Sequence, residues 1–190
     1  HNVESYLSPA YHPLCDGIAL EGVRIAARAL PVAYREGANL QARSDMLMSS
    51  MMGAIAFQKD LGAVHSCAHA LSTVADMHHG LANGIMIDHV MRFNLPAAVP
   101  KMAELARVTG VHGVRSMGDE LAARAFVDWL VRMKAELGIP ATLGAMPTKR
   151  PVTRADLPAL VDVAINDTCH RTNPRPCTRE DFERIFAGAL

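Results

Sequence analysis

Aromatic residues make up only 5% of the 190-residue sequence, although half of its residues are hydrophobic. No stretch alternates apolar and polar residues over the length of a useful strand. The apolar positions are mostly Ala, Leu, Val and Met, which favour packed helices over sheets. The length suits one domain, or a domain and a half, with a buried core. We therefore expect an all-α, multi-helix bundle.

The sequence has no excess charge of either sign, because nineteen basic residues balance nineteen acidic ones. No basic run stands out either, so nothing in the charge pattern indicates a nucleic-acid partner or an anionic membrane surface. No apolar stretch approaches the ~20 residues that a membrane-spanning helix needs. We expect neither a nucleic-acid partner nor a membrane.

Cysteine is scarce, and the four that occur (Cys15, Cys67, Cys169 and Cys177) form no CxxC pair. Since no signal peptide is recognisable, we expect reduced thiols in a cytoplasmic protein. The chain begins with His1 rather than Met, within what looks like an amphipathic helix that has no capping residue ahead of it. We expect it to be a piece of a longer protein.

Helical periodicity, capping residues and Pro or Gly stops predict eight or nine helices. Asn39 is an N-cap candidate, Gly37 and Gly138 are stops, and Thr153 to Asp156 form a capping-type opening. Residues 139–153 are expected to be irregular. The predicted helices cover 1–8, 14–34, 40–59, 64–76, 80–93, 97–108, 118–137, 153–165 and 178–190.

The segment from Gly62 to Asn94 holds five of the nine histidines, namely His65, His69, His78, His79 and His89. They lie among small and apolar residues. Histidine is the commonest metal ligand and the side chain best suited to proton transfer near neutral pH. The segment is therefore a candidate metal-dependent active site.

The spacing of these histidines constrains how they could share a metal. His65 and His69 are four residues apart, so on a helix they share a face with Cβ atoms about 6 Å apart. His79 would lie ~21 Å beyond His65 on one continuous helix. A shared metal therefore requires the chain to fold back, and the residues from Asp76 to His78 are a plausible corner. His78 and His79 are adjacent, so at most one of them is a ligand.

The residues alone leave a second interpretation open, in which each histidine is a hydrogen-bonded core or surface residue. The spacing matches neither the HExxH pattern of zincins, nor a C2H2 finger, nor a Glu-x-x-His di-iron pair. Glutamate is absent from 62–94, which disfavours a carboxylate-bridged di-iron bundle. The spacing therefore does not decide whether these histidines form a metal site or are hydrogen-bonded residues of the core or surface.

Three segments resemble the iron-containing (group III) alcohol dehydrogenases. GAVHSCAHALS and MHHGLANGIMIDHV, within 62–94, resemble the signature of that family. The opening residues 1–25 resemble its metal-ligand helix, and 167–186 resemble its closing Asn-Pro-Arg segment. The resemblance covers essentially the whole chain and implies the family's helical C-terminal domain, as in dehydroquinate synthase-like proteins. The family's N-terminal α/β nucleotide-binding domain has no counterpart in 1–190.

The resemblance also implies roles for particular residues. His1, His65 and His79 match the three histidine ligands of a divalent metal, usually Fe²⁺ and in relatives Zn²⁺. The family's fourth ligand, an Asp, would lie four residues before His1. His69 matches a histidine implicated in the active site, and is expected to relay a proton. Two further residues, Cys169 and His170, lie in a loop expected near the nicotinamide.

The implied activity is reversible hydride transfer between a small alcohol or diol, with its aldehyde as the product, and NAD or NADP. The chain by itself is expected to be inactive, because it supplies at most three of four ligands. Exposed apolar surface is expected to drive association into a homo-oligomer. The alternative is a stand-alone helical metal-binding or interaction module without redox activity, because no nucleotide-binding motif is present in the sequence.

Overall fold

The computed structural model describes residues 1–145 and 151–190, and within these ranges it contains α-helices and short 3-10 turns but no strand. The expected all-α class is therefore confirmed. The eight α-helices are α1 (Asn2–Leu7), α2 (Pro13–Arg35), α3 (Leu40–Ala56), α4 (Ala63–Ala75), α5 (His79–Val108), α6 (Asp119–Glu136), α7 (Leu157–Asn166) and α8 (Arg179–Ala189).

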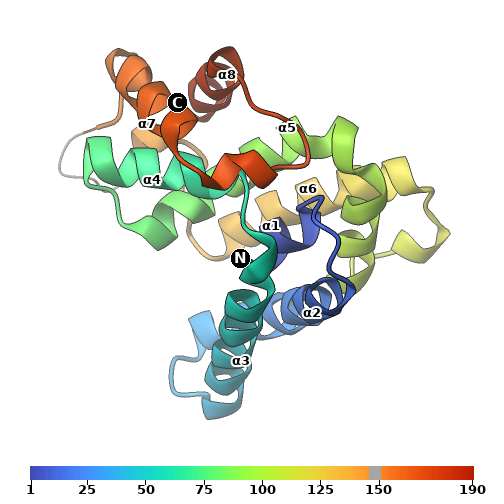
Figure 1. Ribbon diagram of the computed structural model, residues 1–190. Helices are drawn as coiled ribbons and strands as arrows, with labels where there is room; N and C mark the ends of the chain where they lie inside the picture. The colour runs from blue at the N-terminus through green and yellow to red at the C-terminus, as the bar shows by residue number, and fades with distance from the viewer. Residues whose placement is uncertain (146–150) are drawn as a thin grey trace.

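The long helix α5 packs against α6, and this pair lies between two outer groups of helices (Figure 1). On one side, α7 and α8 lie near α4, with α7 packed against α4 and α8 against α7 and α5. On the other side, α2 packs along α3. The short helix α1 contacts α2, α3 and α5, so the amino terminus lies between the two groups rather than at the outside.

The break predicted between the helices at 80–93 and 97–108 is present within α5. It is a kink at Ala98 (φ −134°), just inside the second predicted segment, and helical backbone continues on both sides of it. Pro96 and Pro100 both lie within this element. A proline ring blocks only the hydrogen bond of its own nitrogen and crowds the preceding turn, so packing can hold a helix through it at the cost of a bend.

Other predicted boundaries hold closely. Asn39 caps α3 by accepting a hydrogen bond from Ala42 N–H (3.0 Å), and the helix gives way to a 3-10 turn at Phe57–Lys59. The predicted opening at Thr153 is a capping box. Part of the segment expected to be irregular, 146–150, lies outside the described residues. None of the described helices is long and apolar enough to cross a membrane.

Two glycines let α1 approach its neighbours closely. A Cβ atom on Gly22 of α2 would lie 2.4 Å from Asn2 Oδ1, and one on Gly53 of α3 would lie 2.9 Å from His1 Cβ. Asn2 Nδ2 also donates a hydrogen bond to Ser49 O (2.9 Å). The backbones of α2 and α3 therefore fix the position of His1.

The amino terminus of α4 is capped by side chains from both ends of the chain. Its N-cap residue, Gly62, has no side chain to offer. Ala63 N–H instead donates to Asn173 Oδ1 (3.1 Å), and Val64 N–H donates to Glu4 Oε1 (2.7 Å). Unpaired amide groups at a buried helix end are costly, and an anionic oxygen there also interacts favourably with the helix dipole. These contacts tie α4 to α1 and to the closing loop.

We expect Gly62→Ala to destabilise the fold. The new Cβ would lie 2.6 Å from Glu4 Oε1 and 2.9 Å from Asn173 Oδ1, and both oxygens are held by α4. Overpacking here should cost about 2 kcal/mol or more. A matched control is Gly188→Ala in α8, where nothing lies within 4 Å of the new Cβ. Chemical denaturation should show a loss for the first variant only, and equal stabilities would contradict the packing argument.

Candidate metal centre

The structure brings four of the histidines into one cluster. The ring centroid of His65 lies 4.8 Å from that of His1, 5.4 Å from that of His79 and 6.1 Å from that of His69. The rings of His69 and His79 are stacked at 5.3 Å. His65 is buried, whereas His1 and His79 are exposed. The cluster is therefore open to the outside of this domain.

The cluster depends on the corner that the sequence predicted. Asp76 adopts a left-handed conformation (φ 51°) and ends α4, and α5 begins at His79. This reversal carries His79 back to His65, which lies one turn inside α4. His78 is the exposed N-cap residue of α5 and makes no capping hydrogen bond through its side chain. Only one of the two adjacent histidines therefore makes ring contacts within the cluster.

A buried carboxylate from α1 holds His65. Glu4 Oε2 lies 2.6 Å from His65 Nδ1 and also accepts a hydrogen bond from His65 N–H (3.3 Å). An ionised carboxylate only accepts, so Nδ1 carries the ring proton and Nε2 keeps its lone pair. Carboxylate–histidine pairs of this kind orient metal ligands and increase their basicity. Sequence reasoning missed Glu4, although its position one turn after His1 was a usable signal.

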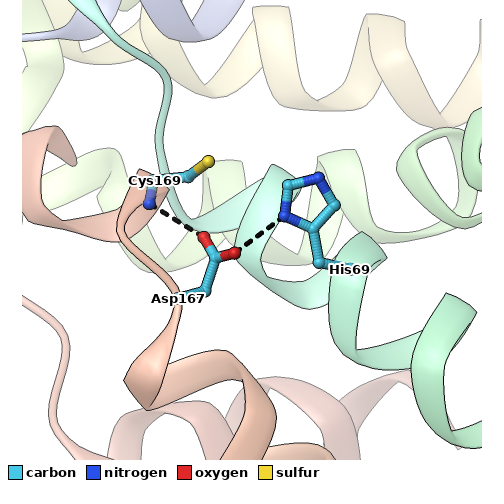
Figure 2. Close-up of side chains that lie close together, drawn as sticks. All are labelled: His69, Asp167 and Cys169. Carbon is cyan, nitrogen blue, oxygen red and sulfur yellow. Dashed lines mark hydrogen bonds and ion pairs between the residues drawn. The ribbon is translucent and has the colours of Figure 1, made fainter.

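A second carboxylate, from the carboxyl end of α7, holds His69. Asp167 Oδ2 lies 2.8 Å from His69 Nδ1, and Figure 2 shows the carboxylate between this ring and the backbone of Cys169. Asp167 Oδ1 accepts hydrogen bonds from Cys169 N–H and from Ser66 Oγ–H, both at 2.8 Å. Sequence reasoning did not assign Asp167 a role, because it is close to His69 only in the folded chain.

The electrostatics of the cluster favour the neutral imidazole of His79. Desolvation lowers the pKa of His79, and the neighbouring histidines at positions 65, 69 and 78 lower it further. Partial burial alone would raise the pKa of Asp167, but the hydrogen bonds from His69, Cys169 and Ser66 hold it at about 2. Neutral imidazole is the form of histidine that binds metals.

His79 has a hydrogen-bond partner of its own. Asn83, one turn further along α5, places Nδ2 3.0 Å from His79 Nε2. That nitrogen therefore presents a lone pair, as a metal ligand must. A metal bound through Nε2 would replace this amide.

The two residues expected near a nicotinamide lie in the loop after α7. Burial and a hydrogen bond to Asp167 raise the pKa of Cys169 to about 12. The imidazole of His170 packs edge-on against Phe182, with Nε2 3.0 Å from Ile165 O. His170 N–H also donates to Ser66 Oγ (3.0 Å). The imidazole of His170 therefore supports the packing of α7 and α8, and contact of either residue with a nicotinamide stays a prediction.

A cavity of about 410 Å³ adjoins the cluster. His1, His65 and His79 lie on its wall, and the remaining wall is largely apolar, including Trp129 and Met133 of α6.

The four cysteines are free, as expected.

Comparison with known proteins agrees with this geometry. A sequence model described as "Fe-containing alcohol dehydrogenase family, C-terminal" matches residues 1–190. The chain belongs to that family. It is 34% identical to 1,3-propanediol dehydrogenase of Klebsiella pneumoniae over 191 residues, and 32% identical to lactaldehyde reductase of Escherichia coli K12 over 190. Each alignment covers 100% of this chain and 48% of the relative.

Solved structures give the same result. A crystal structure of 1,3-propanediol oxidoreductase superposes with a TM-score of 0.94 at 34% identity, covering 100% of this chain and 49% of that one. An alcohol dehydrogenase from Oenococcus oeni superposes with a TM-score of 0.92 at 28% identity, covering 100% of this chain and 48% of that one. The chain spans about half the length of the relatives that it matches.

Family membership implies a divalent metal and a nicotinamide cofactor, and the donor set of the cluster fits the metal. His65 is oriented by Glu4 through Nδ1, which leaves its Nε2 available, and His79 presents the lone pair of Nε2 to the amide of Asn83. Imidazole nitrogen suits iron and zinc alike. The donor chemistry therefore matches the metal that the family's name implies.

Proposed function

We propose that this chain is the metal-binding domain of an NAD(P)-linked alcohol dehydrogenase that interconverts a small alcohol or diol and its aldehyde. The observation that carries the proposal is the contact of His65 with both His1 and His79, in a chain that belongs to the iron-containing family. The names of relatives, among them a diol dehydrogenase and a lactaldehyde reductase, support a small substrate.

In this proposal, His1, His65 and His79 hold the metal. Fe²⁺ is favoured by the description of the family, and Zn²⁺ is the alternative because it accepts the same donors. When bound, the metal would supply Lewis acidity toward the alcohol oxygen, and a nicotinamide would supply the hydride acceptor. Glu4 contributes by fixing the ring of His65, as its 2.6 Å contact with Nδ1 indicates.

His69 is proposed to accept the proton of the alcohol and release it to solvent. Its side chain is 40% exposed, so solvent reaches the ring directly. Its stacking on His79 places it beside a proposed ligand. A positioned histidine contributes typically ~10²–10⁴-fold to such proton transfers. Cys169 and His170 are proposed to lie near the nicotinamide, since both lie within three residues of Asp167 in the loop after α7.

The proposal predicts a strict metal requirement. The gene product at its natural length should oxidise a short diol such as 1,3-propanediol with NAD⁺ or NADP⁺, and should lose this activity on chelation. Adding Fe²⁺ under anaerobic conditions, or Zn²⁺, should restore it, and the absorbance of the reduced nicotinamide measures the rate. Full activity in protein shown by elemental analysis to be metal-free would contradict the proposal.

A further inference from the structure

The hydrogen bonds around Asp167 are unevenly distributed between its two oxygens. Oδ1 accepts from Ser66 Oγ–H and from Cys169 N–H, both at 2.8 Å, whereas Oδ2 faces His69 Nδ1, also at 2.8 Å. Ser66 and His69 lie one turn apart on α4, so the carboxylate bridges that helix and the loop after α7 (Figure 2). The donors at 2.8 Å are therefore held by the backbone of Cys169 and by the helix α4.

A metal bound by His69, Asp167 and Cys169 is a competing interpretation, because their ligand atoms lie within 4.8 Å of one another. The hydrogen bonds argue against it. A metal would have to displace the proton that His69 shares with Asp167, and Cys169 would have to ionise although burial and Asp167 raise its pKa to about 12. Thiolate is the ligating form of cysteine. The three side chains are thus a hydrogen-bonded unit.

We propose that Asp167 is the positioning residue that keeps the ring proton of His69 on Nδ1, so that Nε2 is free to accept the proton of the substrate. An ionised carboxylate has no proton to donate, so the nitrogen that faces it must be the donor. A neutral imidazole then has its acceptor on the opposite nitrogen. The inference rests on the proposed function for the role of His69, but the tautomer itself is a property of the domain.

The substitution Asp167→Asn tests this assignment sharply, because the surroundings decide how the amide is oriented. Two donors, Ser66 Oγ–H and Cys169 N–H, require an oxygen at the Oδ1 position. The amide NH₂ must then face His69 Nδ1 and donate to it. The variant is nearly isosteric, but it moves the proton of His69 to Nε2, where it blocks proton acceptance.

Long-range ¹H–¹⁵N correlation spectra of the imidazoles, recorded on metal-free protein, report the tautomer directly. We expect the Nδ1–H form of His69 in the unmodified protein and the Nε2–H form in Asp167→Asn. The spectrum of the unmodified protein is decisive even where the variant folds poorly. A proton on Nε2 of His69 in the unmodified protein would overturn the inference.

Kinetics of the metal-loaded protein at natural length give the second measurement. We expect Asp167→Asn to lower kcat by about 10²-fold or more, with KM nearly unchanged, because only proton acceptance is lost. Asp162→Asn is the matched control, since Asp162 lies on α7 in a surface ion pair with Arg179 and should leave both the tautomer and kcat unchanged.

The proposed function and the positioning role of Asp167 can be overturned separately. A natural-length protein without any alcohol dehydrogenase activity would remove the proposed function, while the tautomer of His69 could still be measured. An active protein in which Asp167→Asn retains both kcat and the Nδ1–H tautomer would overturn the positioning role alone. Unchanged tautomer with lower kcat and lower thermal stability would also overturn it, since Asp167 would then act only through packing.

Discussion

Replacing His79 with alanine is expected to lower the affinity of the protein for Fe²⁺ or Zn²⁺ by at least a hundredfold. Structural metal sites with four ligands gain ~10–16 kcal/mol on binding, which is roughly 3 kcal/mol per ligand, or two orders of magnitude. His79 is exposed at the start of α5, so its removal leaves no buried cavity and should cost little folding stability. Calorimetric titration of metal-free protein measures the affinity, and circular dichroism checks the fold.

The neighbouring residue provides the matched control. His78→Ala makes the same chemical change one position earlier, at an exposed side chain that makes no capping hydrogen bond. We expect it to leave metal affinity within a factor of about three, since surface substitutions are typically worth less than ~0.5 kcal/mol. Equal losses in the two variants would place His78 in the site as well. Unchanged affinity in His79→Ala would remove His79 from the ligand set.

The fold was largely predictable, because its signals are local. Helix openings such as Asn39 and Thr178 carry their capping partners within three residues, and both caps lie where the sequence predicted helices to begin. The break in α5 was predictable from Pro96. Its position at Ala98 was not, because it depends on how α5 packs along α6.

The site, too, was predictable only where its residues are close in sequence. The spacing of His65 and His69, together with a corner before His79, was readable from residues close in sequence, and the ring contacts agree with that reading. The partner carboxylates were not readable. Glutamate is absent from 62–94, and the acidic groups come instead from Glu4 and Asp167, separated by 61 and 98 residues from the histidines that they hold. Such long-range pairs have no local pattern.

Substitution of Glu4 is expected to have the second large effect, because its single carboxylate accepts hydrogen bonds from three donors. Its oxygens accept hydrogen bonds from Val64 N–H and His65 N–H, and one of them also holds His65 Nδ1. Glu4→Ala would leave these donors buried without partners, at ~1–3 kcal/mol each. We expect a loss of about 3–5 kcal/mol in the free energy of unfolding, comparable to breaking a buried ion pair, and a metal affinity lowered by about 10–100-fold.

Two further variants separate the causes of this loss. Glu136→Ala removes a glutamate from a surface ion pair with Arg35, and it should unfold at nearly the same denaturant concentration as the unmodified protein. Glu4→Gln keeps an oxygen for Val64 N–H but turns its amide NH₂ toward the ring of His65. Glu4→Gln should therefore be more stable than Glu4→Ala. Its metal affinity should stay low, because the ring proton of His65 moves from Nδ1 to Nε2, the nitrogen needed by the metal. Full recovery of both properties in Glu4→Gln would show that shape alone, and not the charge of Glu4, orients His65.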